Sequence, residues 1–243
     1  MISLEWHDEL TSTAEVLCAR ARAGHVREGT LLLAGRQTAG RGRGSAEEKP
    51  FYSPVGGCYM SLLLRGVCLE DVLPLTSRTA LAARRVLARY GCNVGVKWVN
   101  DLFCGGKKVG GILVQRPAGG AAEDCIVVSC GINRYPNPVE PPPEYLRDIM
   151  GWCFRDSATA SDIKTFALAL AAEIMDIASE RDNGALVREY REASIVLGRN
   201  IQHEYNGLSV HSAALDVTPA GGLLVRCTDG RETVLTSGSI KLL

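Results

Sequence analysis

Short apolar runs and amphipathic segments alternate along most of the chain. Runs of strand-like composition occupy residues 2–6, 30–35, 58–66, 94–100, 107–116 and 124–133. Apolar residues recur with helical spacing at 12–24, 71–91 and 161–181, and residues 185–194 continue the last helix. The first helix is expected to begin at Ser12, with Glu15 closing a capping box, and to stop at Gly24. Short glycine turns between the middle strands favour antiparallel pairing, so the pattern predicts an α+β fold with a mixed, largely antiparallel sheet.

The pattern changes after Ser194. Four short strand-like runs follow, "LGRNIQHEY", "LSVHSAALDV", "GGLLVRCTDG" and "RETVLT", and the chain ends in "SGSIKLL". Strands of this length separated by glycine turns are typical of a small β-barrel. We therefore expect two domains, a main domain at 1–194 and a small β-barrel at 195–243.

Composition removes several classes of function. Among the 243 residues, 46% are hydrophobic and the formal net charge is +0, which disfavours disorder and a general nucleic-acid binder. No apolar run has the length of a membrane span, and the first residues do not resemble a signal peptide. The nine cysteines and four histidines form no ligand pattern, so we predict a cytoplasmic protein with reduced thiols and no structural metal.

The stretch "AGRQTAGRGRGSAEEKP", residues 34–50, contains four glycines and three arginines and no large apolar residue before its end. It departs from a P-loop and from a dinucleotide fingerprint, because both the required residues and a directly following helix are missing. Glycines allow a backbone nest, and Arg41 and Arg43 supply fork-shaped donors, so the loop suits a carboxylate or phosphate. A solvated surface loop is the alternative, and an RGG-like nucleic-acid segment is disfavoured by the neutral net charge.

A second polar cluster lies in "VKWVNDLFCGGKKVGGILVQ". Lys97, Asn100, Asp101 and Lys108 interrupt strand-like apolar sequence, and the glycine pair at 110–111 allows close backbone approach. Each residue alone is typical of an exposed strand, whereas together they indicate a site on a sheet face. Asn133 ends the following strand, where its amide could hydrogen-bond a ligand.

Five stretches in one order, "GRQTAGRGRG", "SPVGGCYMSL", "KWVNDL", "KKVGGIL" and "GIN", resemble the biotin protein ligases. The resemblance spans about residues 5–133, and the C-terminal module is similar to the small SH3-like barrel of that family. It implies a two-step reaction in which the biotin carboxylate attacks the α-phosphate of ATP, giving biotinyl-5′-AMP and pyrophosphate. The acyl group then passes to a lysine of a biotin carboxyl carrier domain. Positioning and charge neutralisation by arginines, a lysine and Mg²⁺ are sufficient for this chemistry, because the attacking carboxylate is already ionised.

The resemblance also implies the site residues. The biotin-binding set is Ser12, Thr13, Ala14, Gln37, Gly40, Arg41, Gly42, Arg43, Lys108 and Gly111. The ATP-binding set is Arg41, Arg43, Lys97, Trp98, Asn100 and Asn133. The catalytic set is Arg41, Lys108 and Asp101. Within it, Lys108 neutralises developing charge, and Asp101 orients the incoming lysine or a metal-bound water.

The chain also departs from the family pattern. Ala14 stands where an Asn often follows Ser-Thr, Val99 replaces a usual Pro, and the residues from Ser45 to Phe51 form a longer link than usual. Trp152 is the candidate to cover adenine. We expect no N-terminal DNA-binding domain, no DNA or membrane partner, and a carrier domain of a biotin-dependent carboxylase as substrate. The alternatives are a lipoate or octanoyl ligase and a non-catalytic biotin-binding protein, and a homodimer through a sheet edge is one arrangement that the resemblance allows.

Overall fold

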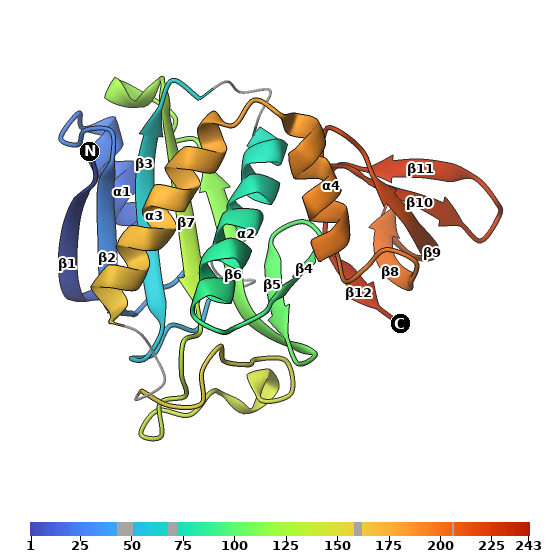
Figure 1. Cartoon of the computed structure of the whole chain (residues 1–243), viewed down its shortest axis with the longest axis horizontal. Coiled ribbons are helices and arrows are strands. Elements are labelled where there is room, and N and C mark those ends of the chain that lie inside the picture. Colours follow the sequence, from blue (N-terminus) through green and yellow to red (C-terminus); the bar gives the residue numbers. More distant parts are fainter. Residues whose placement is uncertain (43–50, 68–71, 158–161, 206) are drawn as a thin grey trace.

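The largest element of the molecule is a seven-stranded sheet. The computed structural model describes residues 1–42, 51–67, 72–157, 162–205 and 207–243. The strand order is β1-β2-β3-β7-β6-β5-β4 (Figure 1). The strands are β1 (Ser3–Leu10), β2 (Thr30–Gln37), β3 (Cys58–Arg65), β4 (Gly95–Lys97), β5 (Asp101–Cys104), β6 (Lys107–Gln115) and β7 (Cys125–Ile132). β1 and β2 run parallel and the other neighbouring pairs are antiparallel, which confirms the expected mixed sheet.

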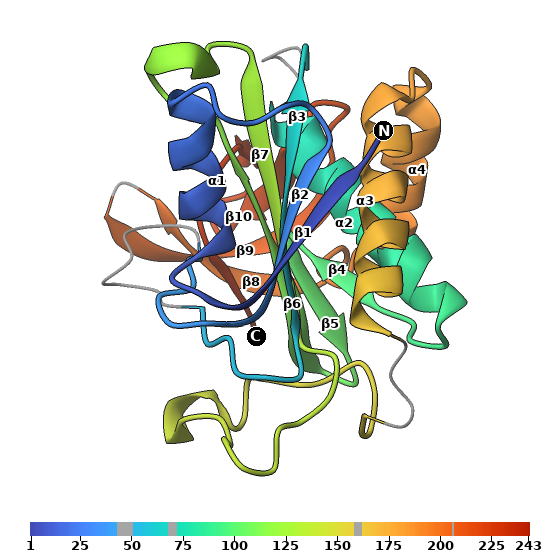
Figure 2. The same cartoon turned by 90° about the vertical axis from the view of Figure 1, so that its left-hand side faces the viewer.

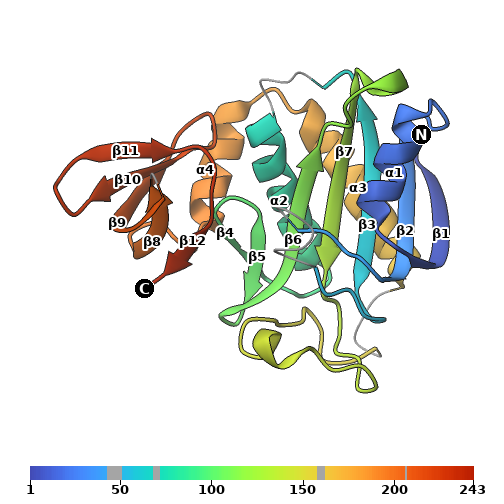
Figure 3. The same cartoon turned by 180° about the vertical axis from the view of Figure 1, so that it is seen from behind.

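Helices cover both faces of this sheet. α1 (Thr13–Arg22) lies on one face, and α2 (Val72–Arg89) and α3 (Ile163–Ser179) lie on the other, with α4 (Asn183–Ala193) next to α2 (Figure 2). Seen from behind, α1 lies over β2, β3 and β7, and β6, β5 and β4 follow on the side of the sheet nearer the small C-terminal sheet (Figure 3). None of the described helices is long and apolar enough to cross a membrane.

The start of α1 agrees with the sequence. The Ser12 hydroxyl accepts a hydrogen bond from the Glu15 backbone N–H at 3.5 Å, as expected for an N-cap. The Glu15 carboxylate, which was expected to close a capping box, forms an ion pair with Arg41. The start of the helix is thereby joined to the glycine–arginine loop.

Two expectations about secondary structure are wrong. The helical pattern from 161 to 194 is two helices, because Glu180 is extended and the Asp182 carboxylate caps α4 by accepting from the Ala185 N–H at 2.9 Å. Likewise, the run 94–100 is not one strand. It ends at Lys97, the chain turns, and β5 pairs with both β4 and β6. In both places a local turn interrupts a periodic pattern, and such turns leave little trace in hydrophobicity.

A second, five-stranded sheet follows α4, with the order β11-β10-β9-β8-β12. Its strands are β8 (Asn200–Tyr205), β9 (Leu208–Val217), β10 (Leu223–Cys227), β11 (Glu232–Leu235) and β12 (Ile240–Leu242). All neighbouring pairs are antiparallel. Buried side chains of this sheet belong to the same hydrophobic core as α2, α3 and the large sheet. The indole N–H of Trp98 adds a hydrogen bond of 2.9 Å to the Gly221 carbonyl, so the two sheets are packed together.

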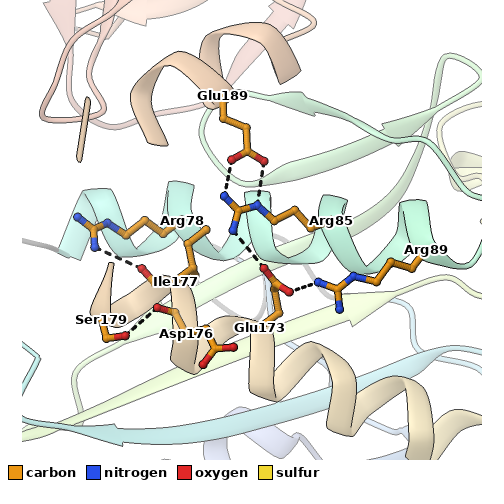
Figure 4. A network of polar contacts seen from close by, with 8 residues as sticks. All are labelled: Arg78, Arg85, Arg89, Glu173, Asp176, Ile177, Ser179 and Glu189. Atoms are coloured by element: carbon orange, nitrogen blue, oxygen red, sulfur yellow. Dashed lines mark hydrogen bonds and ion pairs between the residues drawn. The ribbon is translucent and has the colours of Figure 1, made fainter. Parts of the chain in front are cut away.

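Three helices behind the large sheet are joined by an ionic network (Figure 4). Arg85 on α2 forms hydrogen bonds with Glu173 on α3 and with both carboxylate oxygens of Glu189 on α4. Arg89 also pairs with Glu173. Burial raises the pKa of Glu173, but hydrogen bonds from both arginines outweigh this effect and leave it below its usual value.

Candidate active site

A cavity of about 210 Å³ opens on the face of the large sheet that carries α1. Its walls come from the start of α1, the end of β2, the following loop, and strands β3, β5, β6 and β7. The residues that line it are Ser12, Thr13, Ala14, Gln37, Arg41, Gly42, Phe51, Met60, Asn100, Asp101, Lys108, Gly111, Ile112, Leu113, Ser129, Cys130, Gly131 and Ser239. The cavity therefore collects residues from nearly the whole length of the chain.

A chain of hydrogen bonds forms the floor of the cavity. The Gln37 amide oxygen accepts from the backbone N–H of Thr13 at 2.8 Å and from its hydroxyl at 3.2 Å. The Thr13 hydroxyl in turn accepts from Ser61 at 2.9 Å, and Ser61 lies 2.8 Å from Ser129. Because the one proton of Ser61 points to Thr13, the Ser129 hydroxyl donates to Ser61. The floor thus presents fixed polar groups in a buried site, which suits a small ligand with several hydrogen-bonding atoms.

The Gln37 side chain is fixed from its other side as well. Its Nε2 donates to the Ser53 hydroxyl at 3.0 Å, and Ser53 donates to the Phe51 carbonyl at 2.9 Å. A Cβ on Gly40 would overlap the Phe51 carbonyl oxygen and lie 2.6 Å from Ser53 Oγ. Gly40 is not among the residues that line the cavity. A glycine is needed here because any side chain would prevent this part of the loop from approaching residues 51–53.

Two cations line the cavity, and each is held by a carboxylate. Arg41 pairs with Glu15, and Lys108 Nζ lies 2.6 Å from Asp101 Oδ1. These side chains are between 22% and 38% exposed, so they are accessible yet partly desolvated. The Arg41 Nε is buried and has no hydrogen-bond partner within the described part of the chain. An anionic ligand could take donors from both cations, because their present partners are acceptors on the protein itself.

Glycines on adjacent strands fit the cavity wall closely. Gly111 and Gly131 face each other across β6 and β7. A Cβ on Gly131 would clash with the Phe51 ring, so this ring packs directly on the strand backbone. A Cβ on Gly111 would lie 3.7 Å from Lys108 Nζ, an ordinary contact, and would narrow the cavity beside that cation.

A second, smaller cavity of about 110 Å³ adjoins the first. Its lining is Phe51, Tyr52, Lys108, Asn133, Leu146, Ile149 and Met150, so it shares Phe51 and Lys108 with the larger cavity. The Asn133 amide donates to the Gly151 carbonyl at 3.1 Å and is held in place by it. Its Oδ1 is buried without a hydrogen-bond partner among the described residues. This oxygen is an acceptor for a ligand donor, because leaving it unpaired is costly.

The structure separates the expected site residues into groups. Those that line the larger cavity are Ser12, Thr13, Ala14, Gln37, Arg41, Gly42, Asn100, Asp101, Lys108 and Gly111. Asn133 lines the smaller cavity. Arg43 lies outside the described residues, as does most of the segment 45–51.

Lys97 and Trp98 line neither cavity. Trp98 is 2% exposed and bonded to Gly221, and the Lys97 ammonium lies 5.7 Å from the centre of the Phe103 ring. Lys97 ends β4 and Trp98 begins the turn before β5, and neither reaches the ligand cavities. Asn100 reaches the larger cavity, but its Nδ2 also donates to the Ile112 carbonyl at 2.6 Å and fixes that turn to β6.

Several cavity residues were missed from the sequence. Ser129 lines the cavity, and Ser61 supports it from behind by its hydrogen bond to Thr13. Both are polar residues inside the apolar runs "YMSLLL" and "VVSC", and that interruption was the available signal. Ser239 comes from the C-terminal segment, far from the other lining residues in sequence. Cys130 also lines the cavity, but burial raises the pKa of its thiol, so it is a neutral wall residue and not a nucleophile.

Residues 7–133, more than half of the chain, match the model of the biotin/lipoate A/B protein ligase family. The chain belongs to this family. A biotin–[acetyl-CoA-carboxylase] ligase of Mycobacterium tuberculosis is 29% identical over 251 residues, which cover 94% of this chain and 85% of that protein. The bifunctional ligase/repressor BirA of Bacillus subtilis is 36% identical over 149 residues, 60% of this chain and 44% of that protein. The chain thus matches less than half the length of this relative.

Solved structures of the biotin/lipoate ligase family share the whole fold. The biotin protein ligase from Aquifex aeolicus in complex with biotin and ATP superimposes with a TM-score of 0.80 at 26% identity, covering 99% of this chain and 98% of that chain. The mixed sheet with its helices and the small C-terminal sheet are therefore common to both proteins. All the residues that line the two cavities lie within the matched range 7–133, except Leu146, Ile149, Met150 and Ser239.

Proposed function

We propose that this protein is an ATP-dependent biotin protein ligase. The observation that carries the proposal is the larger cavity, in which a buried polar floor and two cations line one space. Biotin has a ureido ring rich in hydrogen-bonding atoms, an apolar chain and a carboxylate. The floor lined by Thr13, Gln37 and Ser129 suits the ring, whereas Arg41 and Lys108 suit the carboxylate. Similarity to the Mycobacterium tuberculosis ligase and to the Aquifex aeolicus complex supports the same substrates.

The proposed reaction begins with activation of biotin. The carboxylate oxygen attacks the α-phosphorus of ATP, a P–O bond forms, and pyrophosphate leaves. Arg41 and Lys108 hold the two anions together and offset the negative charge that accumulates between them. Arg41 and Lys108 are now paired with Glu15 and Asp101. When the ligands bind, some N–H groups of the two cations must turn from these carboxylates to the ligand oxygens. In the second step the amine of a carrier lysine attacks the acyl carbon, and AMP leaves.

We assign the nucleotide to the smaller cavity and its surroundings. Lys108 and Phe51 belong to both cavities, so a ligand that spans them passes directly beside the Lys108 ammonium. The unpaired Asn133 Oδ1 suits the exocyclic amine of adenine, which is a hydrogen-bond donor. Trp152 remains a proposal for the residue that covers the base, and the roles of Arg43, Lys97 and Trp98 stay predictions.

The larger cavity offers one carboxylate that could hold a Mg²⁺ ion. Among the described residues that line the larger cavity, Asp101 is the only carboxylate. Mg²⁺ is commonly held by one or two carboxylates together with substrate phosphates, so Asp101 is the residue that would hold it. When bound, the ion neutralises phosphate charge. Asp101 also orients Lys108, and it could accept a proton from the incoming carrier lysine through a hydrogen bond.

The wider context is part of the same proposal. The carrier is a biotin carboxyl carrier domain of a biotin-dependent carboxylase, the location is cytoplasmic, and DNA is not a partner. In this proposal residues 195–243 are the SH3-like barrel domain of the family, and a homodimer would form through an edge of the large sheet.

Biotin-dependent ATP–pyrophosphate exchange tests the proposal. Exchange should require biotin, fail with lipoate, and be followed by transfer of biotin to a purified carrier domain, measured by mass spectrometry. A lipoate ligase is the second candidate, but a dithiolane ring has no N–H or carbonyl group to bond to the polar residues Thr13, Gln37 and Ser129 that line the cavity. Exchange with lipoate would favour that candidate, and biotin binding without exchange would indicate a storage protein.

A further inference from the structure

Two walls of the smaller cavity come from segments that are far apart in sequence. Phe51 and Tyr52 follow the glycine–arginine loop, whereas Leu146, Ile149 and Met150 belong to the segment after β7. Figure 1 shows this later segment as a yellow-green loop below the large sheet. Because ordering a wall at the moment of binding costs free energy, the contacts that already join the two walls affect how tightly the cavity binds a ligand.

The Tyr52 hydroxyl joins the two walls directly. It donates to the Glu140 carbonyl and to the Pro141 carbonyl, each at 3.0 Å. A phenol has one proton, so the two carbonyls share it in a three-centre hydrogen bond. Burial, followed by the nearby Glu140 carboxylate, raises the pKa of Tyr52, and the hydroxyl therefore keeps this proton at neutral pH.

Residues 51–54 are themselves fixed to the large sheet. The N–H of Gln37, at the end of β2, donates to the Ser53 carbonyl at 3.0 Å. The hydroxyl of Tyr59, on β3, donates to the Pro54 carbonyl at 2.8 Å. The phenol that reaches the other wall therefore projects from a base that cannot shift without breaking these hydrogen bonds.

The segment after β7 has a composition that makes such an anchor effective. It contains five prolines between residues 136 and 143, and proline has no N–H group with which to pair as a strand. Three of them are consecutive at 141–143 and lead directly into the 3₁₀ turn Glu144–Leu146. Consecutive prolines form a stiff, extended run. An anchor at its start therefore also positions Leu146, which lines the cavity.

The other end of this segment is bonded to the strand that carries Lys108. The Lys108 N–H donates to the Ile149 carbonyl at 2.8 Å, and the Gly151 N–H donates to the Lys108 carbonyl at 2.8 Å. The wall is thus held at both ends, by the Tyr52 hydroxyl at its start and by β6 at its end.

A second contact between the same parts of the chain is weaker. Arg36 Nη2 lies 3.6 Å from Glu140 Oε1, and Arg36 also pairs with Glu9. The Arg36 and Glu140 side chains are 40% and 38% exposed, and surface ion pairs of this kind contribute little. This contact uses the carboxylate of Glu140, whereas Tyr52 uses its carbonyl, so substitutions can separate the two.

We propose that Tyr52 is a positioning residue for the nucleotide. Its hydroxyl keeps the wall that contains Leu146, Ile149 and Met150 in place against Phe51 before the nucleotide binds. It acts on the wall and not on the reacting atoms, so its removal weakens nucleotide binding without slowing the chemical step. The effect on the nucleotide rests on the proposed function, whereas the effect on the wall does not.

Hydrogen–deuterium exchange of the ligand-free protein tests the effect on the wall. Tyr52→Phe removes the hydroxyl and keeps the ring that lines the cavity. The N–H groups of Leu146 and Arg147 close the 3₁₀ turn by donating to the carbonyls of residues 143 and 144. We expect these amides to exchange faster in Tyr52→Phe than in the wild-type protein, because the turn is no longer anchored. Unchanged deuterium uptake over residues 144–147 would overturn the proposal.

Steady-state pyrophosphate exchange tests the effect on the nucleotide. We expect Tyr52→Phe to raise the KM for ATP about fivefold, the scale of one hydrogen bond, with little change in the KM for biotin or in kcat. A general folding defect would instead raise both KM values and lower kcat. Faster deuterium uptake with an unchanged KM for ATP would overturn the role toward the nucleotide. A wild-type protein without biotin-dependent exchange would refute the proposed function, and the nucleotide role with it, but would leave the anchored wall as a measured property.

Two control variants complete the test. Tyr145→Phe removes a hydroxyl from a tyrosine of the same segment that is 65% exposed and lines neither cavity. Glu140→Gln removes the surface ion pair and keeps the carbonyl that Tyr52 uses. Both should match the wild-type protein in deuterium uptake and in the KM for ATP. A Glu140→Gln variant that behaves like Tyr52→Phe would show that the ion pair holds the segment and would overturn the assignment to the hydroxyl.

Discussion

The ion pair between Lys108 and Asp101 allows a prediction with a defined magnitude. Replacing Lys108 by Met removes the ammonium group and keeps most of the side-chain length. Loss of one charge-assisted contact to a developing anion costs about 3 kcal/mol, or roughly two orders of magnitude in rate. Asp101, which lies 2.6 Å from the ammonium, would then face the phosphates without a cation.

The repulsion between the uncompensated Asp101 carboxylate and a phosphate can also be estimated. At this partly exposed site an effective dielectric constant of about 40 gives a repulsion of about 1.4 kcal/mol between two unit charges about 6 Å apart. We therefore expect Lys108→Met to lower biotin-dependent pyrophosphate exchange by roughly a thousandfold. The double variant Lys108→Met/Asp101→Asn should recover roughly tenfold of this loss, because the uncompensated carboxylate is gone.

The assay is the initial rate of exchange at saturating biotin and ATP, with the single Asp101→Asn variant completing the cycle. Lys107→Met is the matched control, because this neighbouring lysine is exposed and donates to the Arg147 carbonyl, away from both cavities. Normal exchange in Lys108→Met would refute the assignment of this residue. A double variant slower than Lys108→Met would show that the proposed roles of Asp101 toward Mg²⁺ and the carrier lysine outweigh the repulsion.

Further predictions address other parts of the molecule. Thr13→Val should weaken biotin binding about tenfold or more in calorimetry, because it removes the hydroxyl that accepts from Ser61 and donates to Gln37; unchanged affinity would contradict the polar floor. Gly131→Ala should lower exchange and the melting temperature together, because the new methyl group displaces the Phe51 ring, whereas a silent variant would show that the ring moves freely. A chain ending at Ser194 should transfer little biotin, because it lacks the cavity residue Ser239, and full activity would make the small sheet dispensable. The lowered pKa of Glu173 means that its contribution to the free energy of unfolding is present above the unfolded-state pKa and is lost as the pH falls through the folded-state value. Glu173→Gln should therefore be less stable at neutral pH and lose less stability on acidification, and parallel pH curves of the two proteins in urea titrations would contradict this.

The order of elements along the chain was largely determined by the sequence. Hydrophobic periodicity located most strands and the helices α1, α2 and α3, because it reflects burial against neighbours that are regular in spacing. The N-cap Ser12 was also readable, because a cap depends on one side chain and the nearest backbone N–H groups. The break before α4 and the turn that separates β4 from β5 were not readable, since they depend on hydrogen bonds that do not alter the apolar pattern.

The sequence also identified most residues of the larger cavity, through motifs whose order carried the resemblance. What the tertiary structure decided is which of those residues share a space. It directs Trp98 into the contact with Gly221, and it brings Ser129 and Ser239 to the cavity from unrelated parts of the chain. A motif records a residue type at a position, but the direction of a side chain depends on the strand register and on packing partners far away in sequence.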